Sequence, residues 1–349
     1  MDKLTTINWH LTNRCNLCCK HCLYDSGKTK FEEMITAEIR RVIDEFASLN
    51  NLKKTINLYG GEPLLRDDIY EIIEYAASKG IEIGITTNIN VNSEKFEKLL
   101  QSSVSRVSID IDGSPQHHNW LRNKENHINH VIESFELLKK AGKYISSTCV
   151  LHNQNKKDIY DVLELGRKIG LKALSFYLFT PLGRGKLLKD FVIGAHEWLS
   201  IKKQISDWCK ENHPDYIVVF ERSYDKKENL ENNKSLCMTG TGEVLDIRSD
   251  GHVCFCGLLI GIGQPNLGNV KEDSLVSILK KRKENTINIT CGCSALALSQ
   301  GQDINNLVDF RESEDNIVPV CPYNWDLLWA GNDPETRKKF IHLVEEQNT

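Results

Sequence analysis

Short apolar segments alternate with longer segments, whose apolar positions recur every three or four residues, through the first half of the chain. The short segments are typical of buried strands, and the longer ones are typical of helices with one apolar face. Six strands are expected, at residues 7–11, 55–59, 81–85, 107–112, 145–151 and 172–178. Strands that alternate with helices in this way predict an α/β fold with a parallel sheet.

The expected helices carry recognisable end signals. One helix has four apolar residues between positions 39 and 46 on a single face, and Thr36 is placed to cap it. A later helix over residues 157–169 is expected to stop at Gly170, because glycine readily adopts the left-handed conformation that ends helices. A further helix, over residues 195–210, is expected to lead out of the sheet region.

The fourth expected strand has an unusual polar face. Ser108, Asp110 and Asp112 alternate with apolar residues, so all three side chains point to the same side of the strand. Three polar side chains on one side would be costly in a closed apolar core. They predict a wet interior near the mouth of a barrel.

Four cysteines follow the first strand closely, at positions 15, 18, 19 and 22. Cys15, Cys19 and Cys22 have three and then two residues between them, so one loop can present three thiolates to a single metal centre. A [4Fe-4S] cluster normally takes four cysteines, and three would leave one iron open. Structural zinc prefers four closed ligands, for which no matching pair lies nearby, and ordinary buried thiols are the other alternative. Cys18 is interpreted as a spectator.

This spacing, together with Tyr59-Gly60-Gly61-Glu62-Pro63, resembles the radical S-adenosylmethionine (radical SAM) enzyme superfamily. The resemblance implies a partial (β/α)6 TIM-like barrel, a [4Fe-4S] cluster and S-adenosylmethionine, which is cleaved to a 5'-deoxyadenosyl radical. Working residues are then expected at the C-terminal ends of the strands. One departure is His21, where the family most often has an aromatic residue.

The same resemblance implies a set of residues that bind S-adenosylmethionine. These are Gly60, Gly61, Glu62, Asn88, Ser108, Asp110 and Arg122. The Gly-Gly-Glu motif is expected to contact the amino group, and Arg122 the carboxylate. The ribose contact stays open between Ser108 and Asp110. The alternatives are a plain turn for the glycines and a surface salt bridge for Arg122.

A second group of cysteines lies late in the chain. Cys237, Gly251 and Cys256 are spaced as in the SPASM or twitch extension of the family, with a β-hairpin expected over residues 247–253. This resemblance implies one auxiliary [4Fe-4S] cluster. The preferred ligands are Cys237, Cys256, Cys293 and Cys321, with Cys291 a close rival to Cys293 and Cys254 a weaker candidate. Zinc bound by the same thiolates is the open alternative.

The length of 349 residues allows one large domain and an appendage, since single cores rarely exceed about 250–300 residues. We expect the barrel over residues 1–215 and a small C-terminal iron-sulfur domain with a final helix over residues 216–349. The polar segment 225–234 is expected to be a solvated linker or mobile loop.

Composition and charge limit the partners, the cellular location and the cysteine chemistry that we expect. The 44 basic and 48 acidic residues give a net charge of −4, which argues against nucleic acid as a partner. The chain has no apolar run long enough to span a membrane and no apolar signal core at its N-terminus, so a cytoplasmic protein is expected. In a reducing compartment, twelve cysteines favour metal ligands over disulfides.

The expected function is hydrogen abstraction from a substrate, with maturation of a ribosomally made precursor peptide by crosslinking, thioether formation or epimerisation as the leading hypothesis. Against it, the chain is expected to open directly at the barrel, without a peptide-recognition domain. The alternatives are tetrapyrrole side-chain chemistry, suggested by the Cys237-x-x-Gly240 stretch, and a non-catalytic cluster carrier. A flavodoxin or ferredoxin is the expected reductant. The sequence identifies no acid, base or radical-quenching residue.

Overall fold

In the part of the chain that the computed structural model describes, the main sheet is open and has ten strands, in the order β10-β9-β1-β2-β3-β4-β5-β6-β7-β12. The structure describes residues 4–27, 32–50, 53–228, 243–254, 256–260, 267–284, 312–319 and 325–331. Neighbouring strands from β1 to β7 are parallel. They are β1 (Thr6–Thr12), β2 (Thr55–Gly60), β3 (Glu82–Thr86), β4 (Arg106–Ser108), β5 (Tyr144–Leu151), β6 (Ala173–Leu178) and β7 (Ile217–Glu221).

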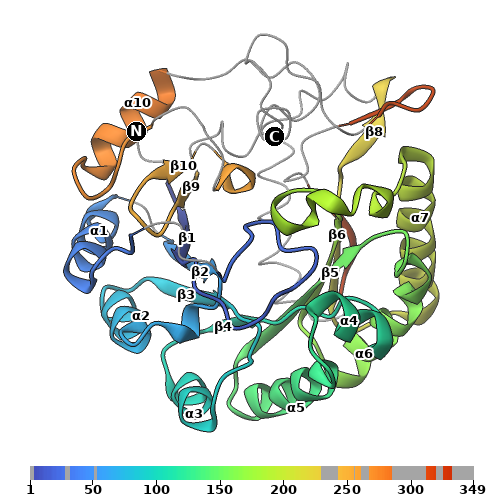
Figure 1. The fold of residues 1–349 in the computed structure, drawn as a ribbon, viewed down its shortest axis with the longest axis horizontal. Coiled ribbons are helices and arrows are strands. Elements are labelled where there is room, and N and C mark those ends of the chain that lie inside the picture. The colour runs from blue at the N-terminus through green and yellow to red at the C-terminus, as the bar shows by residue number, and fades with distance from the viewer. Residues whose placement is uncertain are drawn as a thin grey trace.

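Helices lie on the outer side of the curved sheet (Figure 1). The α-helices are α1 (Thr36–Ser48), α2 (Ile69–Ser78), α3 (Ser93–Gln101), α4 (Pro115–Arg122), α5 (His127–Lys140), α6 (Ile159–Ile169), α7 (Ala195–Asn212) and α10 (Leu275–Glu284). Short 3-10 turns are η1 (Pro63–Leu65), η2 (Lys156–Asp158), η3 (Gly183–Leu187), η4 (Lys189–Phe191) and η5 (Gly257–Leu259). The apolar face expected between positions 39 and 46 is fully buried in α1. Burial of such faces is the main source of helix stability in a protein.

The expected strands and the α/β fold class are confirmed. The fourth strand is shorter than expected as a regular element, but its extended backbone continues, because Ile109 and Ile111 donate to carbonyls of β5 at 3.1 and 2.9 Å. Helix α6 ends at Gly170, which has a left-handed φ of 79°. The cap expected at Thr36 is wrong: Ile35 is the N-cap residue, and Glu38 accepts from its backbone amide at 3.0 Å.

Late segments extend both edges of this sheet. Strand β9 (Val244–Ile247) pairs in parallel with β1, and β10 (Val253–Cys254) returns antiparallel to β9, so the expected hairpin is confirmed. At the other edge, β12 (Trp325–Ala330) pairs antiparallel with β7. Strands from both sides of position 215 therefore share one sheet, and the domain boundary stays a prediction.

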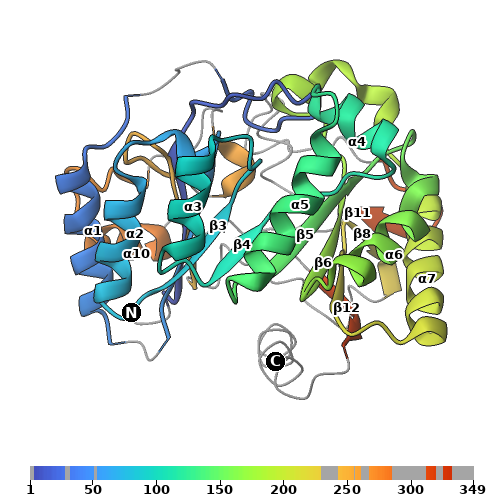
Figure 2. The same cartoon turned by 90° about the horizontal axis from the view of Figure 1, so that it is seen from below.

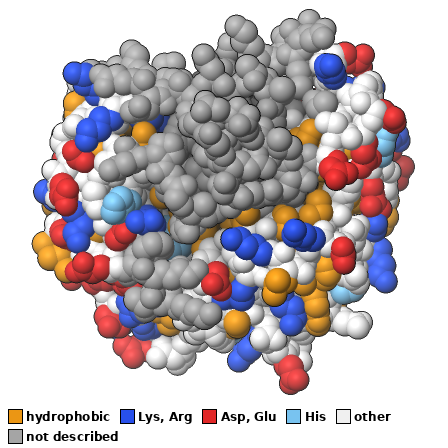
Figure 3. All heavy atoms as spheres, turned by 45° about the horizontal axis from the view of Figure 1, so that its top comes forward, with side chains coloured by type: hydrophobic (Ala, Val, Ile, Leu, Met, Phe, Trp, Pro, Cys, Tyr) orange, Lys and Arg blue, Asp and Glu red, His pale blue; other side chains and the backbone are white. Residues whose placement is uncertain are grey.

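A separate two-stranded sheet is formed by β8 (Tyr224–Lys226) and β11 (Ile317–Pro319). The expected linker at 225–234 is therefore wrong at its start, because residues 225 and 226 belong to β8. No helix in the described ranges is long and apolar enough to cross a bilayer. On the face drawn in Figure 3, basic and acidic side chains of the described residues are interspersed.

Candidate functional site

A cavity of about 370 Å³ opens at the carboxyl ends of the parallel strands. Most of the predicted site residues that the structure describes line it, namely Cys15, Cys19, Cys22, Gly60, Gly61, Asn88, Asp110 and Arg122. Ser108 and Glu62 are not part of the lining. Figure 2 shows the segment that follows β1, which carries the cysteines, at the same edge of the molecule as α4.

The cysteine loop presents three of its four thiols to this cavity. Cys19 is buried, Cys15 and Cys22 are half-buried, and Cys18 is exposed and does not line the cavity. Burial raises the pKa of Cys15, and it raises that of Cys19 to about 11. Among the described residues, no three His, Cys, Asp or Glu side chains are close enough to bind one metal ion. Three thiols on one cavity are the donor set that a [4Fe-4S] cluster with one open iron requires.

The two glycines at the end of β2, Gly60 and Gly61, dock against the base of the cysteine loop. The amide of Gly61 donates to the Thr12 carbonyl at 2.7 Å, and the amide of Glu62 donates to the Arg14 carbonyl at 2.8 Å. A Cβ atom on Gly61 would lie 2.1 Å from the Arg14 oxygen, and one on Gly60 would lie 2.5 Å from the Thr12 oxygen. Gly60 also has a φ of 138°, which side chains disfavour. Because Gly60 and Gly61 have no side chain, the backbone at Thr12 and Arg14 can pack directly against them, and a ligand can also come close to their backbone.

The carboxylate of Glu62 is buried and faces the end of β3. It accepts from the Thr87 hydroxyl and the Asn88 amide at 2.7 Å each, and from the Leu64 amide at 3.0 Å. Burial raises the pKa of Glu62 to about 7, against the lowering effect of these donors. The side chain therefore holds the Thr87–Asn88 segment in place, and any contact of Glu62 with S-adenosylmethionine would come from its backbone.

Arg122 is buried between two carboxylates. Its Nη2 lies 2.7 Å from Asp110 Oδ2 and 2.6 Å from Asp112 Oδ2. Burial alone would raise the pKa of Asp112, but the charge of Arg122 holds it below its usual range. Burial raises the pKa of Asp110, although Arg122 opposes this. The surface salt bridge considered for Arg122 is therefore excluded, and the wet polar face expected after β4 contains an internal ion network.

Arg184 clamps the second half of the cysteine loop, a role that the sequence did not reveal. Its Nε donates to the Cys19 carbonyl at 2.9 Å, and its Nη1 donates to the Ser26 carbonyl at 2.7 Å and to Asp25 at 3.0 Å. Its backbone amide donates to the Cys22 carbonyl at 2.9 Å. One residue thus fixes the backbone at both ends of the Cys19–Cys22 segment, Cys19 through its side chain and Cys22 through its backbone amide.

Gly183 makes this clamp possible. It has a φ of 55°, and a Cβ atom there would lie 2.3 Å from the Leu23 carbonyl oxygen and 2.4 Å from that of Cys22. The Gly183-Arg184 pair follows β6 in a Thr-Pro-x-Gly-Arg-Gly stretch. The sequence offers one signal for the clamp role of Arg184. It is a glycine followed by an arginine, placed directly after a strand that ends at the site.

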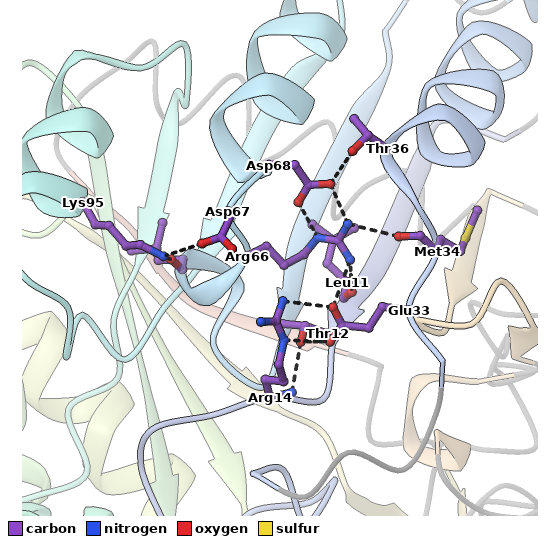
Figure 4. Close-up of polar contacts among 11 residues, drawn as sticks. Leu11, Thr12, Arg14, Glu33, Met34, Thr36, Arg66, Asp67, Asp68 and Lys95 are labelled. Atoms are coloured by element: carbon purple, nitrogen blue, oxygen red, sulfur yellow. Dashed lines mark hydrogen bonds and ion pairs between the residues drawn. The ribbon is translucent and has the colours of Figure 1, made fainter.

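A second arginine anchors the base of the loop (Figure 4). Arg66 is buried and pairs with Asp68 at 2.7 Å and with Glu33 at 3.3 Å. It also donates to the carbonyls of Leu11 and Met34 at 3.3 and 3.1 Å. These bonds tie the end of β1, the start of α1 and the segment after η1 together, so the strand end that carries the cysteine loop is held rigidly.

Aromatic and acidic residues of β6, β7 and β12 form another part of the cavity wall. The rings of Tyr177 and Trp325 lie 4.6 Å apart, and Trp325 pairs in register with Glu221 across β12 and β7. The Glu221 carboxylate accepts from the Leu178 amide at 3.2 Å and from the Ser223 hydroxyl. Glu221, Tyr177 and Trp325 all line the cavity. This wall was not predicted, because it includes a residue more than 140 positions after β6.

Comparison with known proteins agrees with this geometry. Residues 9–166 match the model of the Radical SAM superfamily. These residues therefore form a radical SAM domain. Among its relatives, the AdoMet-dependent heme synthase of Methanosarcina barkeri is 29% identical over 76% of this chain and 79% of its own length. The mycofactocin maturase MftC of Mycolicibacterium smegmatis is 28% identical over 60% of this chain and 52% of its own length.

Solved radical SAM structures share the fold. SuiB of Streptococcus suis bound to S-adenosylmethionine aligns over 89% of this chain and 77% of its own, with a TM-score of 0.69 and 13% identity. The anSMEcpe structure with bound AdoMet covers 99% of this chain and 97% of its own, with a TM-score of 0.66 and 16% identity. The expected partial TIM-like barrel is therefore confirmed for this radical SAM enzyme, and a [4Fe-4S] cluster and S-adenosylmethionine are its cofactors.

The late cysteines are only partly described. Cys254 is the last residue of β10, and Cys256 follows the hairpin; both are buried. Leu258, two residues after Cys256, lines the cavity. The other predicted auxiliary ligands, Cys237, Cys291, Cys293 and Cys321, lie outside the described residues. The auxiliary ligand set therefore stays a prediction.

Proposed function

We propose that Cys15, Cys19 and Cys22 hold the [4Fe-4S] cluster of this radical SAM enzyme. The bound cluster and S-adenosylmethionine would together supply the 5'-deoxyadenosyl radical, which is the chemistry of the cofactors themselves. The chain's own contribution is to bind and orient them at the carboxyl ends of the strands. The observation that supports this is the shared cavity, on which these three thiols lie together with Asn88 and Arg122.

S-adenosylmethionine is proposed to lie between the cysteine loop and the ion network after β4. The backbone of Gly60–Glu62 and the side chain of Asn88 would bind its methionine end, and Arg122 its carboxylate. Asp110 is preferred over Ser108 for the ribose, because Asp110 lines the cavity and Ser108 does not. The carboxylate of Asp110 can accept from hydroxyl groups while it also accepts from Arg122.

The proposed substrate is a residue of a ribosomally made precursor peptide. The part of the cavity wall formed by β6, β7 and β12 offers Glu221 as an acceptor and the rings of Tyr177 and Trp325 as packing surfaces. Such a wall suits amide and amine donors and apolar side chains, and it repels a substrate that carries several carboxylates. One solved structure of SuiB, a protein with the same fold, is bound to a precursor peptide.

Tetrapyrrole chemistry is the second candidate. Relatives named AdoMet-dependent heme synthase align over 76–79% of this chain, a larger share than the MftC relatives do. Against this candidate stands the carboxylate of Glu221 in the cavity wall, because the side chains of biological tetrapyrroles include carboxylates. The two candidates therefore predict opposite charge preferences at Glu221.

Incubation with defined substrates separates these candidates. Anaerobically reconstituted, reduced enzyme would be given the product of any short reading frame beside its gene, or iron-coproporphyrin III, and 5'-deoxyadenosine and substrate mass would be followed by chromatography and mass spectrometry. Peptide-dependent 5'-deoxyadenosine with a changed peptide mass supports the proposal. A changed porphyrin mass would overturn it in favour of the second candidate. Intact clusters without any 5'-deoxyadenosine would indicate a carrier protein.

The auxiliary cluster and the partners are further parts of the proposal. Cys237, Cys256 and Cys321, with Cys293 or Cys291, are proposed to hold one auxiliary [4Fe-4S] cluster in a C-terminal domain, and a cytoplasmic flavodoxin or ferredoxin is proposed as reductant. Two clusters require about eight irons per chain. About four irons together with stoichiometric zinc would contradict the auxiliary cluster.

A further inference from the structure

A row of hydrogen bonds runs from Asp112 to the cysteine loop through two buried histidines. The Asp112 amide donates to His118 Nδ1 at 3.1 Å, and His118 Nε2 lies 2.9 Å from His127 Nδ1. His127 Nε2 lies 2.9 Å from the carbonyl oxygen of Asn88. The two imidazole rings are nearly parallel, with 7° between their planes. The row thus connects the end of β4 to the end of β3 through α4 and α5.

The groups at the two ends of this row decide which atom donates in each of its hydrogen bonds. A backbone amide can only donate, so His118 Nδ1 must accept and its Nε2 must carry the proton. His127 Nδ1 must then accept, and His127 Nε2 donates to the Asn88 carbonyl, which can only accept. Burial lowers the pKa of His118 to about 3 and that of His127 to about 4, so both rings are neutral near pH 7. Each ring therefore has one tautomer that satisfies all its bonds.

Asn88 is held in one orientation at the far end of the row. Its carbonyl accepts from His127 and its amide donates to Glu62. Its side-chain Oδ1 accepts from the Asn90 amide at 2.8 Å, so the Nδ2 group must point the other way. Nδ2 donates to Asn16 Oδ1 at 3.2 Å and lies 3.5 Å from Cys15 Sγ. The amide flip of Asn88, and with it a hydrogen bond to the first cysteine of the loop, is thus determined by the surrounding bonds.

The backbone beside Asn88 needs this support. Ile89 has a left-handed φ of 58°, which is costly for a β-branched residue. The segment is therefore kept in place by contacts from α5, where His130 Nε2 lies 2.9 Å from the Ile89 carbonyl oxygen, close to the bond that His127 makes. Without these contacts the segment would relax, and the Asn88 side chain would move away from Cys15.

We propose that His118 and His127 are positioning residues that fix Asn88 against Cys15 and thereby set the reduction potential of the cluster. The inference rests on the proposed ligation of the cluster by Cys15. Hydrogen bonds to cluster sulfurs are among the features that set such potentials. A donor stabilises the added negative charge of the reduced cluster, so its loss shifts the potential to more negative values. Contacts outside the ligand set commonly tune metal sites in this way.

Three substitutions at His127 test the proposal, with the cluster potential measured by EPR-monitored redox titration of the reconstituted enzyme. His127→Gln keeps a donor near the Nε2 position, whereas His127→Asn places its amide near Nδ1 and His127→Leu has no polar atom. We expect a more negative potential for the Asn and Leu variants, a nearly unchanged potential for the Gln variant, and unchanged iron content in all three. Asn88→Ala removes the donor itself and should shift the potential in the same direction.

His117→Asn is the matched control, because His117 is the neighbour of His118 on α4 but bonds to Asp158, outside the row. Its potential should equal that of the unmodified enzyme. Equal potentials for His127→Leu, Asn88→Ala and the unmodified enzyme, with full iron content, would overturn the inference. A Cys15→Ala variant separates this failure from a failure of the proposed ligation: iron retained in full by Cys15→Ala contradicts the ligation itself.

Discussion

Arg122 donates from Nε to Asp112 Oδ2 at 2.7 Å, in a place where the Asp112 side chain is completely shielded from solvent. The other Asp112 oxygen accepts from the Val150 amide of β5 at 3.1 Å. This relationship ties the C-terminal end of α4 to the strand ends that surround the cavity. It also places a fixed positive charge beside Cys19, where a cluster carrying negative charge is proposed.

Removal of Arg122 should destabilise the fold strongly, because it leaves two buried carboxylates without their cation. We expect Arg122→Ala to lower the free energy of unfolding by about 3–5 kcal/mol, as is usual when one partner of a buried ion pair is removed. Anaerobic denaturant titration measures this. The control is Arg167→Ala, which removes an exposed pair with Glu164 and should cost less than about 1 kcal/mol. Equal losses for both variants would contradict the structural account of Arg122.

A methyl group at Gly61 should displace the cysteine loop. Gly61→Ala would place Cβ 2.1 Å from the Arg14 carbonyl oxygen, so we expect a several-fold loss of bound iron after reconstitution. Gly80→Ala is the matched control. At Gly80 a Cβ atom would meet nothing within 4 Å. The alanine there should lower the free energy of unfolding by about 1–2 kcal/mol, because it must adopt the left-handed φ of 75°. Full iron in Gly61→Ala would show that the loop does not depend on this close contact.

Loss of the Arg184 clamp should loosen the segment between Cys19 and Cys22. Arg184→Ala removes three hydrogen bonds to the loop. Because the side chain is 21% exposed, we expect a cost of about 2 kcal/mol, at the low end for bonds to a charged group. Iron content and thermal denaturation report the effect, and the exposed Lys186→Ala is the control. The clamp would be dispensable if both variants kept the same iron and the same melting temperature.

Glu62 should make stability depend on pH. Its pKa is raised from 4.5 to about 7 in the folded protein, so the folded state binds more protons than the unfolded state between these values. The contribution of Glu62 to stability is thus present below pH 4.5 and is lost as pH rises towards 7. Glu62→Gln does not titrate. As pH rises from 4.5 to 7, the free energy of unfolding of this variant, minus that of the unmodified protein, should therefore increase by up to about 3 kcal/mol. Parallel pH curves would contradict the raised pKa.

Local patterns predicted the features that depend on near neighbours in the chain. The strand positions, the end of α6 at Gly170 and the β9–β10 hairpin follow from apolar periodicity and turn residues. The cap at Thr36 failed because a tertiary partner competes: its hydroxyl bonds to Asp68 at 2.7 Å instead of to the helix backbone. Hydrogen bonds of this kind are decided by the packing of α1 against the segment after β2.

The parts of the site that were missed all join distant residues. Arg184 reaches Cys19 across 165 positions, and Trp325 meets Tyr177 only because β12 pairs with β7. The sequence named Arg122 and Asp110 as separate ligand contacts, but it could not show that they bond to each other. Spacing motifs identify which residues carry the chemistry, whereas the network that orients them depends on tertiary structure.

The most direct test of the account is the iron content of a variant with alanine at Cys15, Cys19 and Cys22, compared with Cys18→Ala. After anaerobic reconstitution and reduction with S-adenosylmethionine present, we predict that the triple variant loses about four irons per chain and all 5'-deoxyadenosine formation. Cys18→Ala should retain both, because its thiol is exposed and lies off the cavity. Unchanged iron and unchanged 5'-deoxyadenosine in the triple variant would contradict the assignment of these three cysteines to the cluster.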